Sequence, residues 1–296
     1  MIRLEGVSKR FGAIEALAPL DLEIPSGEWL GVFGRNGSGK TSLLRILVGL
    51  SRPTTGKVLL HGQPPHAEDW RAVRRTLGFM PERIAFAEHL TGQRTLQYFA
   101  RLKGADLATV DRLLERVGLC DAAARPVGTY SKGMRQRLNF AQALLGEPTI
   151  LIVDEPIEGL DAHGVREFFQ LLREVTNRTV VIASHRLPLI THFVDRVCVL
   201  NQGRVTALGS EAELHQRLDL PVRLIVRPSS QDAAGLVDAL GRLPGASVSS
   251  RNGRIVVSLA QRDKLRALAG LESLAGSIQD VRIEEPTLEE VLLETS

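Results

Sequence analysis

The 296-residue sequence contains little cysteine. Its two cysteines, Cys120 and Cys198, are far apart and form no CxxC pair. This pattern argues against a disulfide framework or a zinc site and fits a reducing cytoplasm. Isolated cysteines such as these most often serve only as small packing residues.

The sequence also lacks a strong charge of one sign and a long apolar run. The net charge is +3, and the basic residues are scattered, so we expect no nucleic-acid partner. No apolar run reaches the roughly 18 residues of a membrane-spanning helix, so a membrane role would have to come through a partner. Residues 1–9 alternate in polarity and are expected to form a strand rather than a signal peptide.

Hydrophobic residues make up 44% of the chain and charged residues 24%, which is typical of a globular protein. Short apolar runs at 29–33, 150–153, 179–183 and 197–200 are typical of buried parallel strands. A helical pattern at 165–175 connects two of them. Alternation of strands and helices predicts an α/β fold with a parallel sheet.

Two further regions differ from this pattern. Apolar residues repeat at helical spacing between about 87 and 145, which predicts an all-helical insert. Composition changes near 219–221, and the remainder reads as strand, helix, hairpin, helix, strand and a last helix from about Thr287. We therefore predict a nucleotide-binding domain at 1–219 and a small α+β appendage at 220–296.

A glycine-rich loop follows the first buried strand and fits the pattern GxxxxGK[ST]. Glycines allow backbone N–H groups to surround phosphates, Lys40 would reach the β- and γ-phosphates, and the Thr41 hydroxyl would bind Mg²⁺. A chance match in a glycine-rich turn is the alternative, which the preceding strand and following helix disfavour. We predict that ATP binds Gly34, Arg35, Asn36, Gly37, Ser38, Gly39, Lys40, Thr41 and Ser42.

The acidic pair Asp154 and Glu155 follows the second buried strand. Asp154 is placed to hold Mg²⁺, and Glu155 can accept a proton from the attacking water as a catalytic base. A surface acidic pair opening a loop is the alternative reading. The phosphate-binding loop makes that alternative the weaker one, so the sequence predicts ATP hydrolysis.

These motifs resemble the ATPase subunit of ABC transporters over about residues 1–215. The signature motif is matched by residues 130–136, the D-loop by 159–161, and the switch histidine by His185. Phe11 lies where the family has an adenine-stacking aromatic, and Glu82 occupies the Q-loop position. Taken singly, Phe11 would be a core aromatic, His185 a satisfied polar residue, and 131–133 a turn and helix cap.

The resemblance implies a head-to-tail homodimer that encloses two ATP molecules. Each site would take Ser131 and Gly133 from the second copy, with Asp161 also at the nucleotide and His185 contacting the γ-phosphate. The resemblance further implies a P-loop fold, a separate polytopic permease, a periplasmic accessory protein, and a position on the inner face of the cell membrane.

Three positions depart from the commonest family pattern. The signature reads Ser-Lys-Gly-Met, the Q-loop has Glu82 in place of glutamine, and Ile157 stands where threonine is usual. The first two favour the exporter-like branch of the family. A carboxylate at Glu82 repels phosphate unless Mg²⁺ or a proton intervenes, so we include Glu82 among the Mg²⁺ ligands.

A narrower resemblance connects segments 99–104, 129–138, 141–148, 220–223 and 285–290 with the ATPase of the transporter for nitrous oxide reductase maturation. It implies a cargo of copper or sulfur that passes through a partner, because this chain has no cluster of Cys, Met or His for copper. An exporter of drugs or lipids, a soluble ABC ATPase acting on ribosomes or DNA, and a nucleotide-gated regulatory module are the alternatives. Glu155 argues against the last, because a pure gate needs no base.

Overall fold

The computed structural model describes residues 1–63, 70–175, 177–218, 222–229, 233–243, 245–251 and 253–284. The chain divides into two compact units, Met1–Ser210 and Glu211–Ser296. The predicted boundary at 219/220, the segment 285–290 and the predicted last helix from about Thr287 lie outside the described residues.

The first unit is built on a six-stranded sheet of order β5-β6-β7-β3-β8-β9. All neighbouring pairs are parallel except β8 and β9. The strands are β3 (Trp29–Phe33), β5 (Leu77–Met80), β6 (Ile150–Asp154), β7 (Thr179–Ser184), β8 (Arg196–Asn201) and β9 (Arg204–Gly209). Every residue of β6 and β7 is buried, which explains their continuous apolar sequences. The predicted α/β fold is confirmed.

A second, three-stranded antiparallel sheet joins this core. It consists of β1 (Ile2–Phe11), β2 (Ile14–Ile24) and β4 (Thr55–Leu60) in the order β2-β1-β4. The helix α1 (Lys40–Leu47) contributes four apolar side chains to one cluster with residues of both sheets. Packing from both sides therefore fixes the direction in which α1 leaves the glycine-rich loop.

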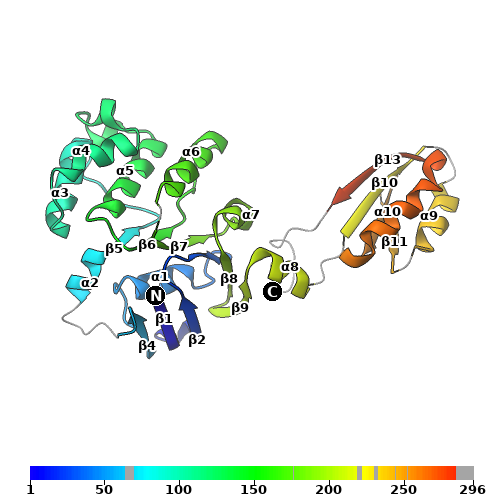
Figure 1. Ribbon diagram of the computed structural model, residues 1–296, viewed down its shortest axis with the longest axis horizontal. Coiled ribbons are helices and arrows are strands. Elements are labelled where there is room, and N and C mark those ends of the chain that lie inside the picture. The colour runs from blue at the N-terminus through cyan, green and yellow to red at the C-terminus, as the bar shows by residue number, and fades with distance from the viewer. Residues whose placement is uncertain are drawn as a thin grey trace. The chain divides into compact units, whose positions relative to one another are not determined.

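The segment between β5 and β6 is helical, and Figure 1 shows its helices gathered together. They are α3 (Gly92–Lys103), α4 (Thr109–Arg116) and α5 (Lys132–Leu144), with short 3-10 turns at Cys120–Ala122 and Val127–Thr129. Helix α2 (Trp70–Thr76) precedes β5, α6 (Ala162–Arg173) follows β6, and α7 (Leu187–Ile190) follows β7, before a 3-10 turn at Thr191–Phe193.

Helix α5 is bound tightly to β5 and the segment after it. The Asn139 amide donates to the Pro81 carbonyl at 2.8 Å, and the Gln142 amide donates to the Phe79 carbonyl at 2.7 Å. Gly78 permits this approach, because a Cβ there would overlap the Ala143 carbonyl oxygen. The same helix therefore determines where the chain runs beyond β5.

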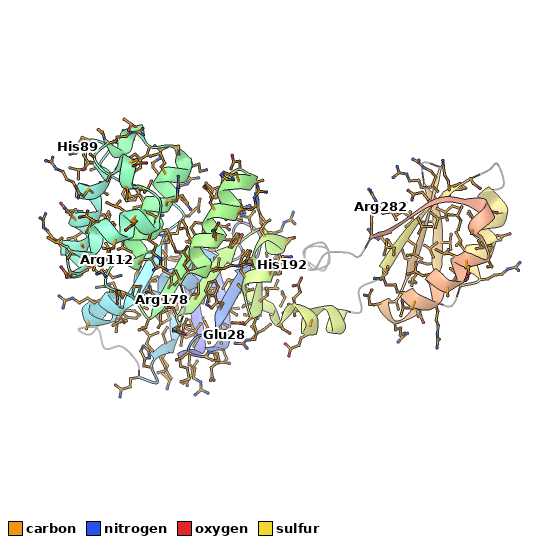
Figure 2. The ribbon with its side chains drawn as sticks, turned by 45° about the horizontal axis from the view of Figure 1, so that its top comes forward. Glu28, His89, Arg112, Arg178, His192 and Arg282 are labelled. Atoms are coloured by element: carbon orange, nitrogen blue, oxygen red, sulfur yellow. The ribbon has the colours of Figure 1, made fainter. Side chains whose placement is uncertain are left out.

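The second unit begins with α8 (Glu211–Leu218) and holds an antiparallel sheet of order β11-β12-β10-β13. Its strands are β10 (Val222–Pro228), β11 (Ser247–Arg251), β12 (Arg254–Leu259) and β13 (Ile278–Glu284), and its further helices are α9 (Ala233–Gly241) and α10 (Lys264–Glu272). Residues of α9 and α10 share one apolar cluster with alternate residues of β10 and β12. Arg282 on β13 is labelled in Figure 2. Among the described helices of both units, none is long and apolar enough to cross a membrane.

Candidate active site

Four segments that carry predicted site residues meet at one edge of the six-stranded sheet. The glycine-rich loop follows β3, Asp154 ends β6, His185 follows β7, and Glu82 follows β5. These strands run parallel, so their carboxyl ends lie at the same edge. The order β5-β6-β7-β3 brings together residues that are far apart in the sequence.

The glycine-rich loop curls around the ammonium group of Lys40. That group donates to the Gly34 carbonyl at 2.7 Å and to the Arg35 carbonyl at 3.3 Å. Gly37 and Gly39 have φ angles of 84° and 107°, which side chains rarely adopt. A Cβ at Gly39 would also lie 2.6 Å from the Ala16 carbonyl oxygen. The loop therefore requires glycine for its backbone conformation and its packing.

Lys40 also forms an ion pair with the predicted base. Its Nζ lies 3.4 Å from Oε1 of Glu155, and both side chains are more than nine-tenths buried. Burial of two charges is stable only when they are paired, so the glycine-rich loop and the end of β6 are held together.

Buried polar oxygens around this pair have no hydrogen-bond partner in the described part of the chain. They are Ser38 Oγ, Asp154 Oδ1 and Glu155 Oε1. Buried polar groups are normally satisfied, so Ser38 Oγ and Asp154 Oδ1 need a partner from outside the described residues, whereas Glu155 Oε1 has only its ion pair with Lys40. Oxygen atoms of this kind suit Mg²⁺ and the groups that accompany a bound nucleotide.

The pKa of Asp154 is raised to about 6. Burial is the main cause, followed by the charges of Glu155 and Glu82, while Lys40 and the nearby Thr41 hydroxyl lower it. The structure therefore places the three predicted Mg²⁺ ligands, Thr41, Glu82 and Asp154, close enough to influence one another.

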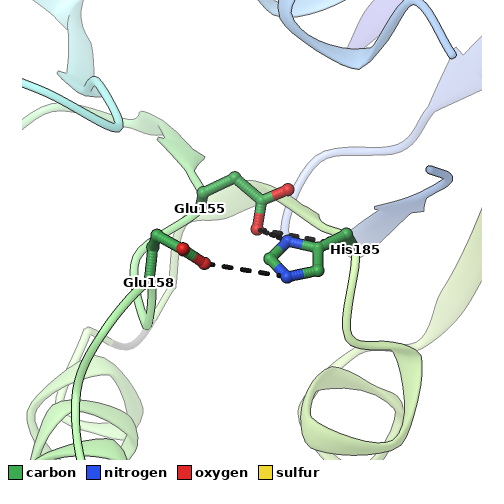
Figure 3. A group of neighbouring side chains, drawn as sticks. All are labelled: Glu155, Glu158 and His185. Carbon is green, nitrogen blue, oxygen red and sulfur yellow. Dashed lines mark hydrogen bonds and ion pairs between the residues drawn. The ribbon is translucent and has the colours of Figure 1, made fainter. Parts of the chain in front are cut away.

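Glu155 and His185 are in direct contact, as Figure 3 shows. The imidazole Nδ1 lies 2.9 Å from Oε2 of Glu155, and the His185 backbone N–H donates to the same oxygen at 3.3 Å. Glu155 has a φ of 44°, an uncommon value for a residue with a side chain. Its backbone N–H donates to the Ala183 carbonyl at 2.9 Å, which ties this strained residue to β7.

The other predicted nucleotide ligands have local roles in the single chain. Ser131 caps α5 by accepting from the Met134 N–H, and Asp161 caps α6 by accepting from the Gly164 N–H. Gly133 lies in the first turn of α5, where a Cβ would have free space up to 4.0 Å. Phe11 is 52% exposed at the end of β1.

Two residues of the site were missed or left unexplained from the sequence. Glu158 was not predicted, yet its Oε2 lies 3.7 Å from Nε2 of His185. Ile157 had no explanation, and the structure shows that it lies in the turn after β6 and is 1% exposed. An isolated apolar residue in the acidic segment 154–158 was the available signal for a buried anchor.

A parallel sheet whose glycine-rich loop faces an acidic strand end defines a P-loop nucleotide-binding protein. The family model described as ABC transporter matches residues 17–158, and the daunorubicin resistance ATP-binding protein of Streptomyces coeruleorubidus is 36% identical over 99% of this chain and 94% of its own length. The chain belongs to the ATP-binding subunits of ABC transporters, and it is an ATPase.

Two further comparisons agree. The bacitracin transport ATP-binding protein of Enterococcus faecalis is 35% identical over 73% of this chain and 71% of its own length. The dimeric structure of MJ0796, a bacterial ABC transporter cassette, is 27% identical with a TM-score of 0.65, over 71% of this chain and 98% of that one. The same cassette has been solved in a post-hydrolysis state bound to ADP and Pi.

We expect Asp154→Asn to stabilise the nucleotide-free protein at pH 7.5. The folded pKa of about 6 lies above the ordinary value of 3.8, so the folded state holds the proton more tightly and loses stability as pH rises from about 4 to 6. Removing the charge should add about 1–2 kcal/mol to the free energy of unfolding at pH 7.5 and little at pH 4.

Urea unfolding with EDTA at both pH values measures this, with the exposed Asp121→Asn as the control. A gain of equal size at pH 4 and pH 7.5, or a loss at pH 7.5, would contradict the assignment of a buried, disfavoured charge at Asp154.

Proposed function

We propose that this chain is the ATP-hydrolysing subunit of an exporter-like ABC transporter whose permease is a separate protein. The observation that carries the proposal is the buried network from Lys40 through Glu155 to His185, at the edge of the sheet where the glycine-rich loop lies. The relatives named for daunorubicin resistance and bacitracin transport support the exporter direction.

In this proposal the glycine-rich loop binds the phosphates of ATP. Its backbone N–H groups and the N-terminus of α1 provide the partial positive charge. Thr41, Asp154 and Glu82 would hold Mg²⁺, which neutralises charge on the phosphates when it is bound. The unpartnered oxygens of Ser38 and Asp154 support this assignment, because they lie buried beside the loop.

Glu155 is the base that accepts a proton from the attacking water. Its carboxylate has two different partners, Lys40 at Oε1 and His185 at Oε2. Lys40 must leave Glu155 in order to reach the β- and γ-phosphates, so nucleotide binding frees one carboxylate oxygen for the water. His185 keeps the carboxylate oriented through Nδ1 and contacts the γ-phosphate through Nε2.

Two copies are proposed to complete each site. Ser131 and Gly133 lie at the start of α5, where a helix N-terminus offers N–H groups to an anion. Ser131 is exposed, so a second molecule could reach it. The dimeric form of the structurally similar cassette supports this arrangement. Asp161 would lie at the dimer interface and Phe11 against the adenine, with the assembly on the inner face of the membrane.

For the cargo, two candidates have separate support. Segments 99–104, 129–138 and 141–148 support a transporter that supplies copper or sulfur for nitrous oxide reductase, with a periplasmic accessory protein. The named relatives support an exporter of antibiotics or similar compounds. In either case the permease selects the cargo.

Replacement of Glu155 by glutamine should abolish turnover while ATP still binds. Loss of the base should lower the hydrolysis rate by a factor of about 10² to 10⁴. Bound ATP would then persist and hold the dimer together, which size-exclusion chromatography with ATP detects. The control is Glu174→Gln, which removes an exposed ion pair with Arg116. Turnover near the wild-type rate in Glu155→Gln would contradict the role of Glu155.

If each ATP site is formed by residues of two copies, two inactive variants should complement each other. Lys40→Ala removes the phosphate contact, and Gly133→Glu adds a long, charged side chain at the start of α5, where the added Cβ meets nothing of its own chain nearer than 4.0 Å. Each variant alone should be inactive, whereas a mixture should recover hydrolysis because mixed dimers hold one intact site. No recovery in mixtures that form mixed dimers would show that Gly133 does not serve the partner's site.

A tagged chain purified from membranes of its host should bring a polytopic membrane protein with it. Deletion of the gene that encodes this chain should then distinguish the two candidate cargoes by the phenotype of the host. Loss of copper from nitrous oxide reductase supports the maturation role, and increased sensitivity to antibiotics supports the resistance role. If the tagged chain instead co-purified with ribosomes or DNA and with no membrane protein, the transporter assignment would be overturned.

A further inference from the structure

A second carboxylate, that of Glu158, approaches His185 at the ring nitrogen that Glu155 does not contact. Figure 3 shows Glu155 and Glu158 on the same side of the His185 ring, each directed at one of its nitrogens. Its Nδ1 lies 2.9 Å from Oε2 of Glu155, and its Nε2 lies 3.7 Å from Oε2 of Glu158. Both ring nitrogens therefore face a carboxylate oxygen.

The turn after β6 holds Glu158 in this position. The Glu158 backbone N–H donates to the Glu155 carbonyl at 3.2 Å. The Gln136 amide of α5 donates to the Pro156 carbonyl at 2.6 Å, and the Ile157 side chain is buried. Three separate restraints therefore fix the backbone of residues 155–158, from which the half-exposed Glu158 side chain reaches His185.

The chemistry of the ring makes the two contacts unequal. Nδ1 lies at hydrogen-bond distance from Glu155, whereas the longer contact at Nε2 is an attraction when the ring is an imidazolium with an N–H at each nitrogen. A neutral imidazole has one N–H and cannot donate to two ionised carboxylates, so the form that satisfies both is the imidazolium, which donates from Nδ1 to Glu155 and points the Nε2 proton toward Glu158. Nε2 is therefore the nitrogen that can exchange partners when a stronger acceptor arrives.

We propose that Glu158 is a positioning residue that holds Nε2 of His185 in the nucleotide-free protein and competes for it with the γ-phosphate of ATP. The inference rests on the proposed contact between His185 and the γ-phosphate. A γ-phosphate that approaches Nε2 meets the negative charge of Glu158, and the two anions repel each other. ADP has no γ-phosphate and does not meet this competition, so Glu158 weakens the binding of ATP and not of ADP.

The test compares equilibrium binding of ATP and of ADP to the full chain in EDTA, where hydrolysis does not proceed. Glu158→Gln keeps the shape of the side chain and removes its charge. Half-exposed ion pairs have modest energies, so we expect ATP to bind about three-fold more tightly and ADP to bind unchanged. Glu158→Asp retains the charge and should return ATP binding toward the wild-type value.

A matched control exists elsewhere in the same unit. His163 and Glu167 form an exposed i,i+4 pair at 3.5 Å on α6. Glu167→Gln removes the same charge from the same type of pair, and it should leave the binding of both nucleotides unchanged. A three-fold change in this control would mean that the effect reflects net charge and would overturn the inference.

The His185→Ala background separates this inference from the proposed function. His185→Ala alone should weaken ATP relative to ADP, and Glu158→Gln should then add nothing. If His185→Ala leaves the ratio of the two affinities unchanged, the proposed γ-phosphate contact itself fails. If His185→Ala lowers the ratio but Glu158→Gln changes ATP and ADP equally, or changes neither, only the role of Glu158 is overturned.

Discussion

The site depends on a buried ion pair between Lys40 and Glu155, whose charged atoms lie 3.4 Å apart. Each charge would be costly to bury alone, so the pair holds the glycine-rich loop against the end of β6. It also explains why the loop keeps its curled form before a nucleotide arrives. The Lys40 ammonium satisfies two loop carbonyls and one carboxylate, and so occupies the space where phosphates are proposed to bind.

The order of the parallel strands determines which groups join this pair. Strand β7 lies between β3 and β6, so the residue that follows it, His185, lies beside Glu155. Strand β5 on the other side of β6 brings Glu82 toward Asp154, and their like charges contribute to the raised pKa of Asp154. The site therefore concentrates negative charge at one place, which destabilises the empty protein and favours cation binding.

Helix α5 connects distant parts of the site through its own side chains. Gln136 donates to the turn after β6, while Asn139 and Gln142 donate to the segment after β5. Ser131, which caps the same helix, is the residue proposed to reach the second copy. One rigid element thus contacts the segments that carry Glu82, Glu158 and the proposed dimer contact.

The buried strands β3, β6, β7 and β8, the glycine-rich loop and the acidic pair are predictable from the sequence, because burial produces continuous apolar runs and phosphate binding demands glycines; β4, β5 and β9 were not predicted. The sequence also predicted that Thr41, Asp154, Glu155 and His185 act in one place, through resemblance to a known family. The pairing of Lys40 with Glu155, the burial of Ile157 and the contact between Glu158 and the histidine are visible only in the folded chain. Those contacts depend on strand order and on a turn with an uncommon φ at Glu155, and neither leaves a periodic pattern in the sequence.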